Sequence, residues 1–287
     1  MKLITIEAGT FKLDGGAMFG VVPKTLWNRL NPADENNLCL WALRCLLIDT
    51  GERKILVDTG IGDKQDAKFR SFFHPEHTDL EKALQKQGYK AEDITDVFIT
   101  HFHFDHVGGA VKRTREGELV PAFPKAVYWS NKRHYDWAYT PNAREKASFL
   151  KENFVPLMEA GVLQFIEENK DGLTDWLPGL KVQFSYGHTE AMMALHIDTP
   201  QGRMVYCADL MPSGLHFGLP YIMAYDIRPL VTLKEKNELL DQAAEKGWML
   251  YFEHDPQTEL STVVKDERGR YRVGKKGKLL DGRAVFE

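Results

Sequence analysis

Short apolar runs separated by turn residues dominate the hydrophobic pattern of this chain. Two such runs, residues 39–51 and 53–60, are joined around Gly51 and predict a β-hairpin whose second strand ends at Asp58. A polar tail predicts a second hairpin that turns near Gly269. Further strands are predicted at residues 96–100, 126–130, 180–186, 193–199, 203–209 and 248–254.

Two segments have the spacing and the end signals of helices. In residues 78–89, Thr78 and Glu81 predict a capping box and Gly88 predicts the end. In residues 232–247, the capping box is predicted at Thr232 and Glu235, with Gly247 beyond the last turn. We find no repeat, low-complexity tract or linker. The order of elements therefore predicts one α/β domain over residues 1–287, with two sheets covered by helices.

Composition and charge argue against several classes of protein. The formal net charge is -4 and no long basic run is present, which argues against nucleic-acid binding. The three cysteines are widely spaced and form no disulfide framework, which indicates a reducing compartment. No signal peptide and no apolar run of about 18 residues is present, so we expect a cytoplasmic protein without a membrane span.

The highest density of potential metal ligands lies directly after the predicted strand at 96–100, where residues 101–106 read HFHFDH. In an extended chain His101, His103 and Asp105 would lie on one side, whereas the adjacent Asp105 and His106 cannot point the same way. The segment could therefore present two histidines to one metal and an Asp-His pair to a second. A His-rich surface turn is the competing interpretation, but four ligand-type residues in six positions argue against it, because burying them unpaired is costly.

The ligand types predict the metal, and the two glycines that follow the motif predict a tight turn. Imidazole and carboxylate ligands suit Zn²⁺, with Mn²⁺, Fe²⁺ and Co²⁺ as alternatives. Gly108 and Gly109 would allow the chain to turn tightly around the site.

Isolated ligand-type residues also follow other predicted strands. His188 follows the strand at 180–186, Asp209 ends the strand at 203–209, and His254 ends the strand at 248–254. A single Asp at a strand end is usually a cap or a turn residue. Together with the HFHFDH segment, however, these residues make seven candidate ligands.

These segments, in this order, resemble the metallo-β-lactamase superfamily: THFHFDHVGG, GHT, CAD and EHD, with ILVDTGIG upstream. The resemblance implies an α/β fold, an αβ/βα sandwich of two mixed sheets flanked by helices, with a binuclear site at one edge. It implies that His101, His103 and His188 hold one metal, that Asp105, His106 and His254 hold the other, and that Asp209 bridges both. The ligand set is similar to that of the branch containing acyl-homoserine lactonases and glyoxalase II.

By the same resemblance, Asp58 supports the metal loop through hydrogen bonds, since ligand histidines usually donate their second N–H to an acceptor. A turn-stabilising role for Asp58 is the alternative. Two metals about 3.5–4 Å apart could share a hydroxide that attacks a carbonyl carbon or a phosphorus atom. Asp105 would orient the hydroxide and carry a proton to the leaving group.

Two departures from the family pattern concern the substrate. The family often has Gly-His-Thr-Pro-Gly-His, whereas this chain continues from His188 with Thr189-Glu190-Ala191-Met192. Lactonases have a tyrosine three residues after the bridging Asp, and Pro212 stands there; Tyr221 or Tyr225 are the candidates to replace it.

Two apolar segments, residues 15–27 and 211–229, could line a substrate pocket for an acyl chain or an aromatic ester. The alternative is that their aromatic residues pack in the core. The pocket candidates are Met18, Phe19, Trp27, His216, Phe217, Tyr221, Met223 and Tyr225.

The leading hypothesis is a binuclear metal-dependent hydrolase of small esters, above all of an acyl-homoserine-like lactone. Hydrolysis of phosphotriesters or phosphodiesters is the alternative reaction, and a non-catalytic metal-binding interaction protein is the alternative class. We expect a small-molecule substrate, no nucleic acid and no membrane, with a homodimer as a compatible assembly. His74, His77 and His134 are interpreted as surface or loop residues, His196 as structural, and Cys207 as buried.

Overall fold

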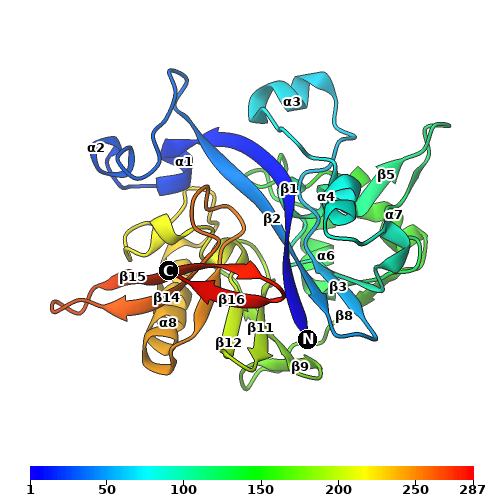
Figure 1. Ribbon diagram of the computed structural model, residues 1–287. Helices are drawn as coiled ribbons and strands as arrows, with labels where there is room; N and C mark the ends of the chain where they lie inside the picture. Colours follow the sequence, from blue (N-terminus) through cyan, green and yellow to red (C-terminus); the bar gives the residue numbers. More distant parts are fainter. The chain divides into compact units, whose positions relative to one another are not determined.

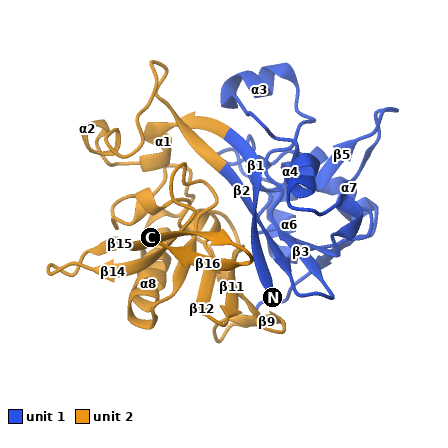
Figure 2. Cartoon of the chain, viewed as in Figure 1, with its two compact units in different colours: residues 1–10, 43–168 blue, residues 11–42, 169–287 orange.

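The computed structural model describes residues 1–287 (Figure 1). Its internal contacts divide the chain into two compact units (Figure 2). Unit 1 contains residues 1–10 and 43–168, and unit 2 contains residues 11–42 and 169–287. Two long strands, β1 (Lys2–Asp14) and β2 (Leu38–Asp49), begin in one unit and end in the other. The assignment of residues 1–287 to a single domain stays a prediction.

Unit 1 is built on a mixed sheet with the strand order β1-β2-β3-β4-β7-β8. β2 and β3 pair antiparallel, as the predicted hairpin requires, whereas β3, β4, β7 and β8 pair parallel. Strands buried on both faces are apolar without alternation, and this explains the continuous runs in the sequence. The remaining strands are β3 (Lys54–Val57), β4 (Asp96–Phe98), β7 (Val127–Ser130) and β8 (Leu163–Phe165), with a small separate sheet of β5 (Val111–Arg113) and β6 (Leu119–Pro121).

The helices of unit 1 are short. They are α3 (Ala67–Phe73), α4 (Leu80–Lys86), α5 (Phe104–Val107), α6 (Lys132–Tyr139) and α7 (Val155–Glu159), with 3-10 turns at Ala91–Asp93, Gly108–Ala110 and Lys151–Asn153.

Unit 2 is built on a second mixed sheet, with the order β16-β15-β14-β13-β12-β11-β10-β9. Only β12 and β13 pair parallel. The predicted terminal hairpin is present as β14 and β15, and Gly269 has the left-handed φ of 69° that the turn requires. The strands are β9 (Thr174–Leu177), β10 (Leu180–Ser185), β11 (Met192–Thr199), β12 (Gly202–Tyr206), β13 (Met249–Tyr251), β14 (Leu260–Lys265), β15 (Tyr271–Leu280) and β16 (Arg283–Phe286).

One long helix, α8 (Pro229–Lys246), flanks this sheet and buries Leu239, Leu240 and Ala243. The shorter helices of unit 2 are α1 (Gly15–Phe19) and α2 (Lys24–Trp27), with 3-10 turns at Ala208–Leu210 and Gly214–His216. Both units therefore consist of a mixed sheet flanked by helices, and the predicted fold class is confirmed. No helix has the length and apolar character needed to cross a membrane.

Both predicted capping boxes are wrong. Helix α4 begins one residue later than expected, because the carboxylate of Asp79 accepts from the backbone N–H of Lys82 and acts as the N-cap in place of Thr78. Helix α8 begins at Pro229, since proline is well suited to a first helical turn, and Thr232 lies inside the helix. The predicted ends are confirmed, because Gly88 and Gly247 both have positive φ.

The prediction that the three cysteines form no disulfide bonds, and that Cys207 is buried, is confirmed. Cys39, Cys45 and Cys207 are free and buried. Burial raises the pKa of the Cys207 thiol, so the neutral thiol is favoured.

Candidate metal centre

The seven predicted ligands are divided between the two units. Unit 1 holds the HFHFDH segment, and unit 2 holds the three isolated residues. All seven residues are buried, with 7% exposure at most. The residues are His101, His103, Asp105 and His106 in unit 1, and His188, Asp209 and His254 in unit 2.

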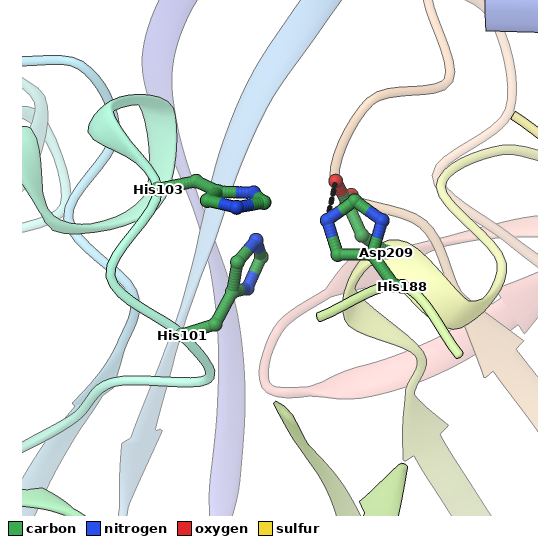
Figure 3. Close-up of side chains that lie close together, drawn as sticks. All are labelled: His101, His103, His188 and Asp209. Carbon is green, nitrogen blue, oxygen red and sulfur yellow. Dashed lines mark ion pairs between the residues drawn. The ribbon is translucent and has the colours of Figure 1, made fainter. Parts of the chain in front are cut away.

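In unit 1 the motif combines an extended half with a helical half. Strand β4 ends at Phe98, three residues before His101, and helix α5 begins at Phe104 with the carbonyl of His103 accepting from His106 N at 3.1 Å. Asp105 therefore lies in a helical turn, and the expectation of an extended chain from His101 to Asp105 is wrong. The change of backbone brings three imidazoles together, because the ring centroid of His101 lies 4.6 Å from that of His103 and 3.9 Å from that of His106 (Figure 3 shows the first pair).

The two glycines after the motif are required for close packing. A Cβ on Gly108 would lie 2.0 Å from the carbonyl oxygen of Ile61, and one on Gly109 would lie 2.3 Å from that of Thr59. Gly108 has an ordinary helical φ of -59°. The glycines thus let the motif approach the loop after β3, and a left-handed turn is not the reason for Gly108.

Asp58 contacts the motif directly. Its Oδ1 accepts from Thr100 N at 2.8 Å, and its Oδ2 accepts from Thr100 Oγ1 at 2.7 Å and lies 3.1 Å from His106 Nδ1. Its backbone φ of 55° is unfavourable for a residue with a side chain and typical of strained positions near functional sites. These contacts are those of a residue that orients His106, in addition to any role in the turn.

In unit 2 a single carboxylate lies between two imidazoles. Asp209 Oδ2 lies 3.2 Å from His188 Nε2, and Asp209 Oδ1 lies 3.3 Å from His254 Nε2 (Figure 3 marks the first pair). Asp209 belongs to the 3-10 turn after β12, whereas the histidines follow β10 and β13. The two oxygens of Asp209 thus serve two different histidines, as a carboxylate shared between two metal sites would.

The orientation of the imidazoles tests whether these residues suit a metal. Four of them have Nδ1 within hydrogen-bonding distance of an oxygen acceptor, so the proton belongs on Nδ1 and the lone pair on Nε2. The pairs are His101 with Thr100 Oγ1 (3.0 Å), His106 with Asp58 Oδ2 (3.1 Å), His188 with Asp226 Oδ1 (2.8 Å) and His254 with the Ala42 carbonyl (2.8 Å). The chain carries groups of buried histidine and aspartate side chains suited to binding metal.

Two buried residues of unit 1 contact the motif but were not predicted to do so. His134 is fully buried, and its Nε2 accepts from the backbone N–H of Phe102 at 2.8 Å, so its interpretation as a surface residue is wrong. Glu145 is buried with Oε1 4.0 Å from His103 Nε2, and its Oε2 accepts from Trp137 Nε1. Neither position carries a local signal, because each contact is formed only in the folded chain.

The candidate pocket residues of unit 2 are mostly buried against one another. Phe19 stacks on Trp27 with ring centroids 5.3 Å apart and on His216 at 5.0 Å, and His216 Nε2 donates to the Met18 carbonyl. Phe217 and Met223 are also buried, Tyr221 is half-buried, and Tyr225 is 37% exposed. Their role as pocket residues stays a prediction.

Pro212 has a structural role at the position of the lactonase tyrosine. Its carbonyl accepts from the backbone N–H of His254 at 3.0 Å.

The other histidines are placed as expected, since His74 and His77 are exposed and His196 is buried.

Comparisons with known proteins identify hydrolases as relatives of this chain. An N-acyl homoserine lactonase of Bacillus thuringiensis is 24% identical over 277 residues, covering 92% of this chain and 96% of the relative. A probable metal-dependent hydrolase from Staphylococcus aureus has a TM-score of 0.84 at 26% identity, covering 95% of this chain and 96% of that chain. The dizinc quorum-quenching lactonase AidC, solved with a product, has a TM-score of 0.77 at 21% identity, covering 95% and 93%, and shares the fold.

The family model described as the metallo-beta-lactamase superfamily matches residues 44–254. That range includes all seven predicted ligands and Asp58. The chain has the mixed sheets of this fold, and the compared proteins are a lactonase, a probable metal-dependent hydrolase and a dizinc lactonase. The chain therefore belongs to the metallo-beta-lactamase superfamily and is an enzyme of the metal-dependent hydrolase type.

Proposed function

We propose that the chain is a binuclear metal-dependent hydrolase that opens small lactones of the acyl-homoserine type. The observation that carries the proposal is the ligand set, in which the Asp209 carboxylate serves two imidazoles through different oxygens. By the family resemblance, His101, His103 and His188 would hold one metal, Asp105, His106 and His254 would hold the second, and Asp209 would supply a ligand oxygen to each. Imidazole and carboxylate donors favour Zn²⁺, with Mn²⁺, Fe²⁺ and Co²⁺ as alternatives.

When bound, the metals would activate water and polarise the substrate oxygen. The chain's own residues have separate tasks. Asp105 has Oδ2 3.8 Å from His106 Nε2, so its carboxylate lies beside a ligand imidazole and can accept a proton and pass it to the leaving oxygen. Asp58 and Asp226 hold the imidazoles of His106 and His188 through Nδ1, which would leave the Nε2 atom of each ring available to a metal.

An aromatic cluster beside the motif supports an apolar acyl group in the substrate. Phe104 lies between His103 and Asp105 in the sequence, and its ring centroid is 5.0 Å from that of Phe69 and 4.6 Å from that of Phe73. Phe69 and Phe73 belong to α3, which has no fully buried residue. Phe69 and Phe73 are partly exposed, so apolar area is available beside Phe104, and such a surface favours an acyl chain over a polyanion.

The experiment that tests the function is the hydrolysis of a medium-chain acyl-homoserine lactone, followed by proton release. Protein is stripped of metal and reconstituted with zinc, manganese or cobalt, and metal content is measured in parallel. We expect metal-dependent ring opening, and we expect the His103→Ala control to lose one metal and its activity. Protein that holds two metals but leaves lactones intact would overturn the lactone assignment, and turnover of phosphotriesters by that protein would select the alternative.

A further inference from the structure

The loop that carries His188 is held along its whole length by residues 226–235 of the same unit. Arg228 N donates to the Gly187 carbonyl at 2.9 Å, and Ile227 N donates to the His188 carbonyl at 3.1 Å. A Cβ on Gly187 would lie 2.2 Å from Thr232 N, so only glycine allows this approach. The backbone around His188 therefore packs directly on the start of α8.

Glu235 adds a carboxylate to this contact. Its Oε1 accepts from Tyr186 N at 2.7 Å and its Oε2 accepts from Gly187 N at 3.1 Å. These are the two amides that directly precede His188. Glu235, which the capping prediction had placed at the start of α8, instead holds this loop from within the helix.

Arg228 binds the loop on both sides of His188. Its Nη1 donates to the Tyr186 carbonyl at 2.8 Å, and its Nη2 donates to Glu190 Oε2 at 2.6 Å. Glu190 is only 4% exposed, so the pair with Arg228 is largely shielded from water on the carboxylate side. One guanidinium thus spans the segment from two residues before the ligand to two residues after it.

The loop needs such support because its backbone is strained. Ala191 has a φ of 53°, in the left-handed region that favours glycine. In the Gly-His-Thr-Pro-Gly-His pattern that is frequent in the family, Glu190 stands at the proline and Ala191 at the second glycine. Proline and glycine suit a turn by themselves. In this chain the turn conformation is stabilised by hydrogen bonds from Arg228 and Glu235, which lie outside the turn.

We infer that Arg228 is a positioning residue for the metal ligand His188, acting through Glu190 and the Tyr186 carbonyl. Asp226, two residues earlier, contacts His188 Nδ1, so one short segment holds both the ring and the backbone of this ligand. The segment also ends the 211–229 loop, the predicted pocket wall. The inference rests on the proposed function, since it presumes that His188 binds a metal.

The test compares Arg228→Gln with Glu190→Gln, Arg228→Lys and a matched control. Arg203→Gln is the control, because it removes an ion pair of the same unit, Arg203 with Asp198 at 2.8 Å, in the β11–β12 pair. Each protein is stripped of metal, and zinc is titrated back against a competing chelator. Cobalt-substituted protein is examined by its visible d–d absorption, which reports coordination geometry, and far-UV circular dichroism reports folding.

We expect Arg228→Gln to weaken zinc binding at one of the two sites by roughly 10–100-fold, which is typical when a residue that orients a ligand is removed. Its cobalt spectrum should change, Glu190→Gln and Arg228→Lys should give smaller losses, and Arg203→Gln should match the wild type. Folded Arg228→Gln protein with two zinc ions at unchanged affinity and an unchanged spectrum would overturn the inference. If Arg228→Gln does not fold, unchanged binding in Glu190→Gln overturns it. Wild-type protein that cannot hold two metals would instead overturn the proposed function.

Discussion

Among single residues, Asp209 places one carboxylate beside two candidate ligand imidazoles. Its two oxygens lie 3.2 Å and 3.3 Å from the Nε2 atoms of His188 and His254. A carboxylate in this position can neutralise two cations at once, whereas an amide offers one oxygen without the negative charge. The charge on this one side chain therefore matters more than its shape.

The Asp209→Asn variant removes that charge and one of the two oxygens while keeping the size of the side chain. We expect it to weaken metal binding at the proposed two-metal site and to lower kcat by orders of magnitude. Elemental analysis should find fewer than two metal ions per chain. Asp198→Asn, which changes an aspartate of the same unit in the pair with Arg203, serves as the control and should keep both metals. An unchanged turnover rate in Asp209→Asn would remove this residue from the bridge.

Among the elements, α4 shows how a helix end is chosen between two adjacent candidates. Thr78 and Asp79 can both accept a backbone hydrogen bond, but the carboxylate of Asp79 accepts from Lys82 N at 3.0 Å. Asp79 also forms an ion pair with Lys82, and these contacts together lower the pKa of Asp79. The N-cap is therefore Asp79, the residue whose side chain reaches the third amide of the helix.

Removing that cap should destabilise the protein by a small, measurable amount. We expect Asp79→Ala to lower the free energy of unfolding by about 1 kcal/mol, measured by urea denaturation. Asp79→Asn should retain most of the stability, because asparagine is also a good N-cap, and Thr78→Val should have little effect on the helix. A larger loss in Thr78→Val than in Asp79→Ala would show that the cap is Thr78.

For the whole molecule, buried titratable groups couple stability to pH. Burial lowers the pKa of His196 to about 3, so this imidazole is neutral in the folded protein at neutral pH. The unfolded chain has a pKa near 6.5 at this residue. The unfolded state therefore binds a proton that the folded state does not, and the stability present above pH 6.5 is lost as the pH falls toward 3.

The His196→Gln variant should remove this part of the pH dependence. Metal-free protein is used, so that loss of metal does not contribute, and the melting temperature is measured from pH 8 to pH 4. We expect the wild type to lose stability more steeply below pH 6.5 than the variant. Curves that run parallel over this range would show that His196 does not titrate differently in the two states.

Much of the local structure could be predicted from the sequence, because the signals are local. The β2–β3 hairpin, the strands that precede the ligands and the glycines that end α4 and α8 follow from short apolar runs and from backbone preferences. Six strands were not predicted, namely β1, β5, β6, β8, β9 and β16, and both capping boxes were predicted at the wrong residues. Helix starts were missed because neighbouring polar residues compete for the same amides.

The sequence by itself determined the chemical kinds of the candidate ligands and their order along the chain. Only the tertiary structure decided which acceptors hold their imidazoles. His188 and Asp226 are 38 positions apart, His106 and Asp58 are 48 apart, and His254 and Ala42 are 212 apart. Ligand identity is a property of single side chains, whereas ligand orientation depends on hydrogen bonds between segments that meet only when the chain folds.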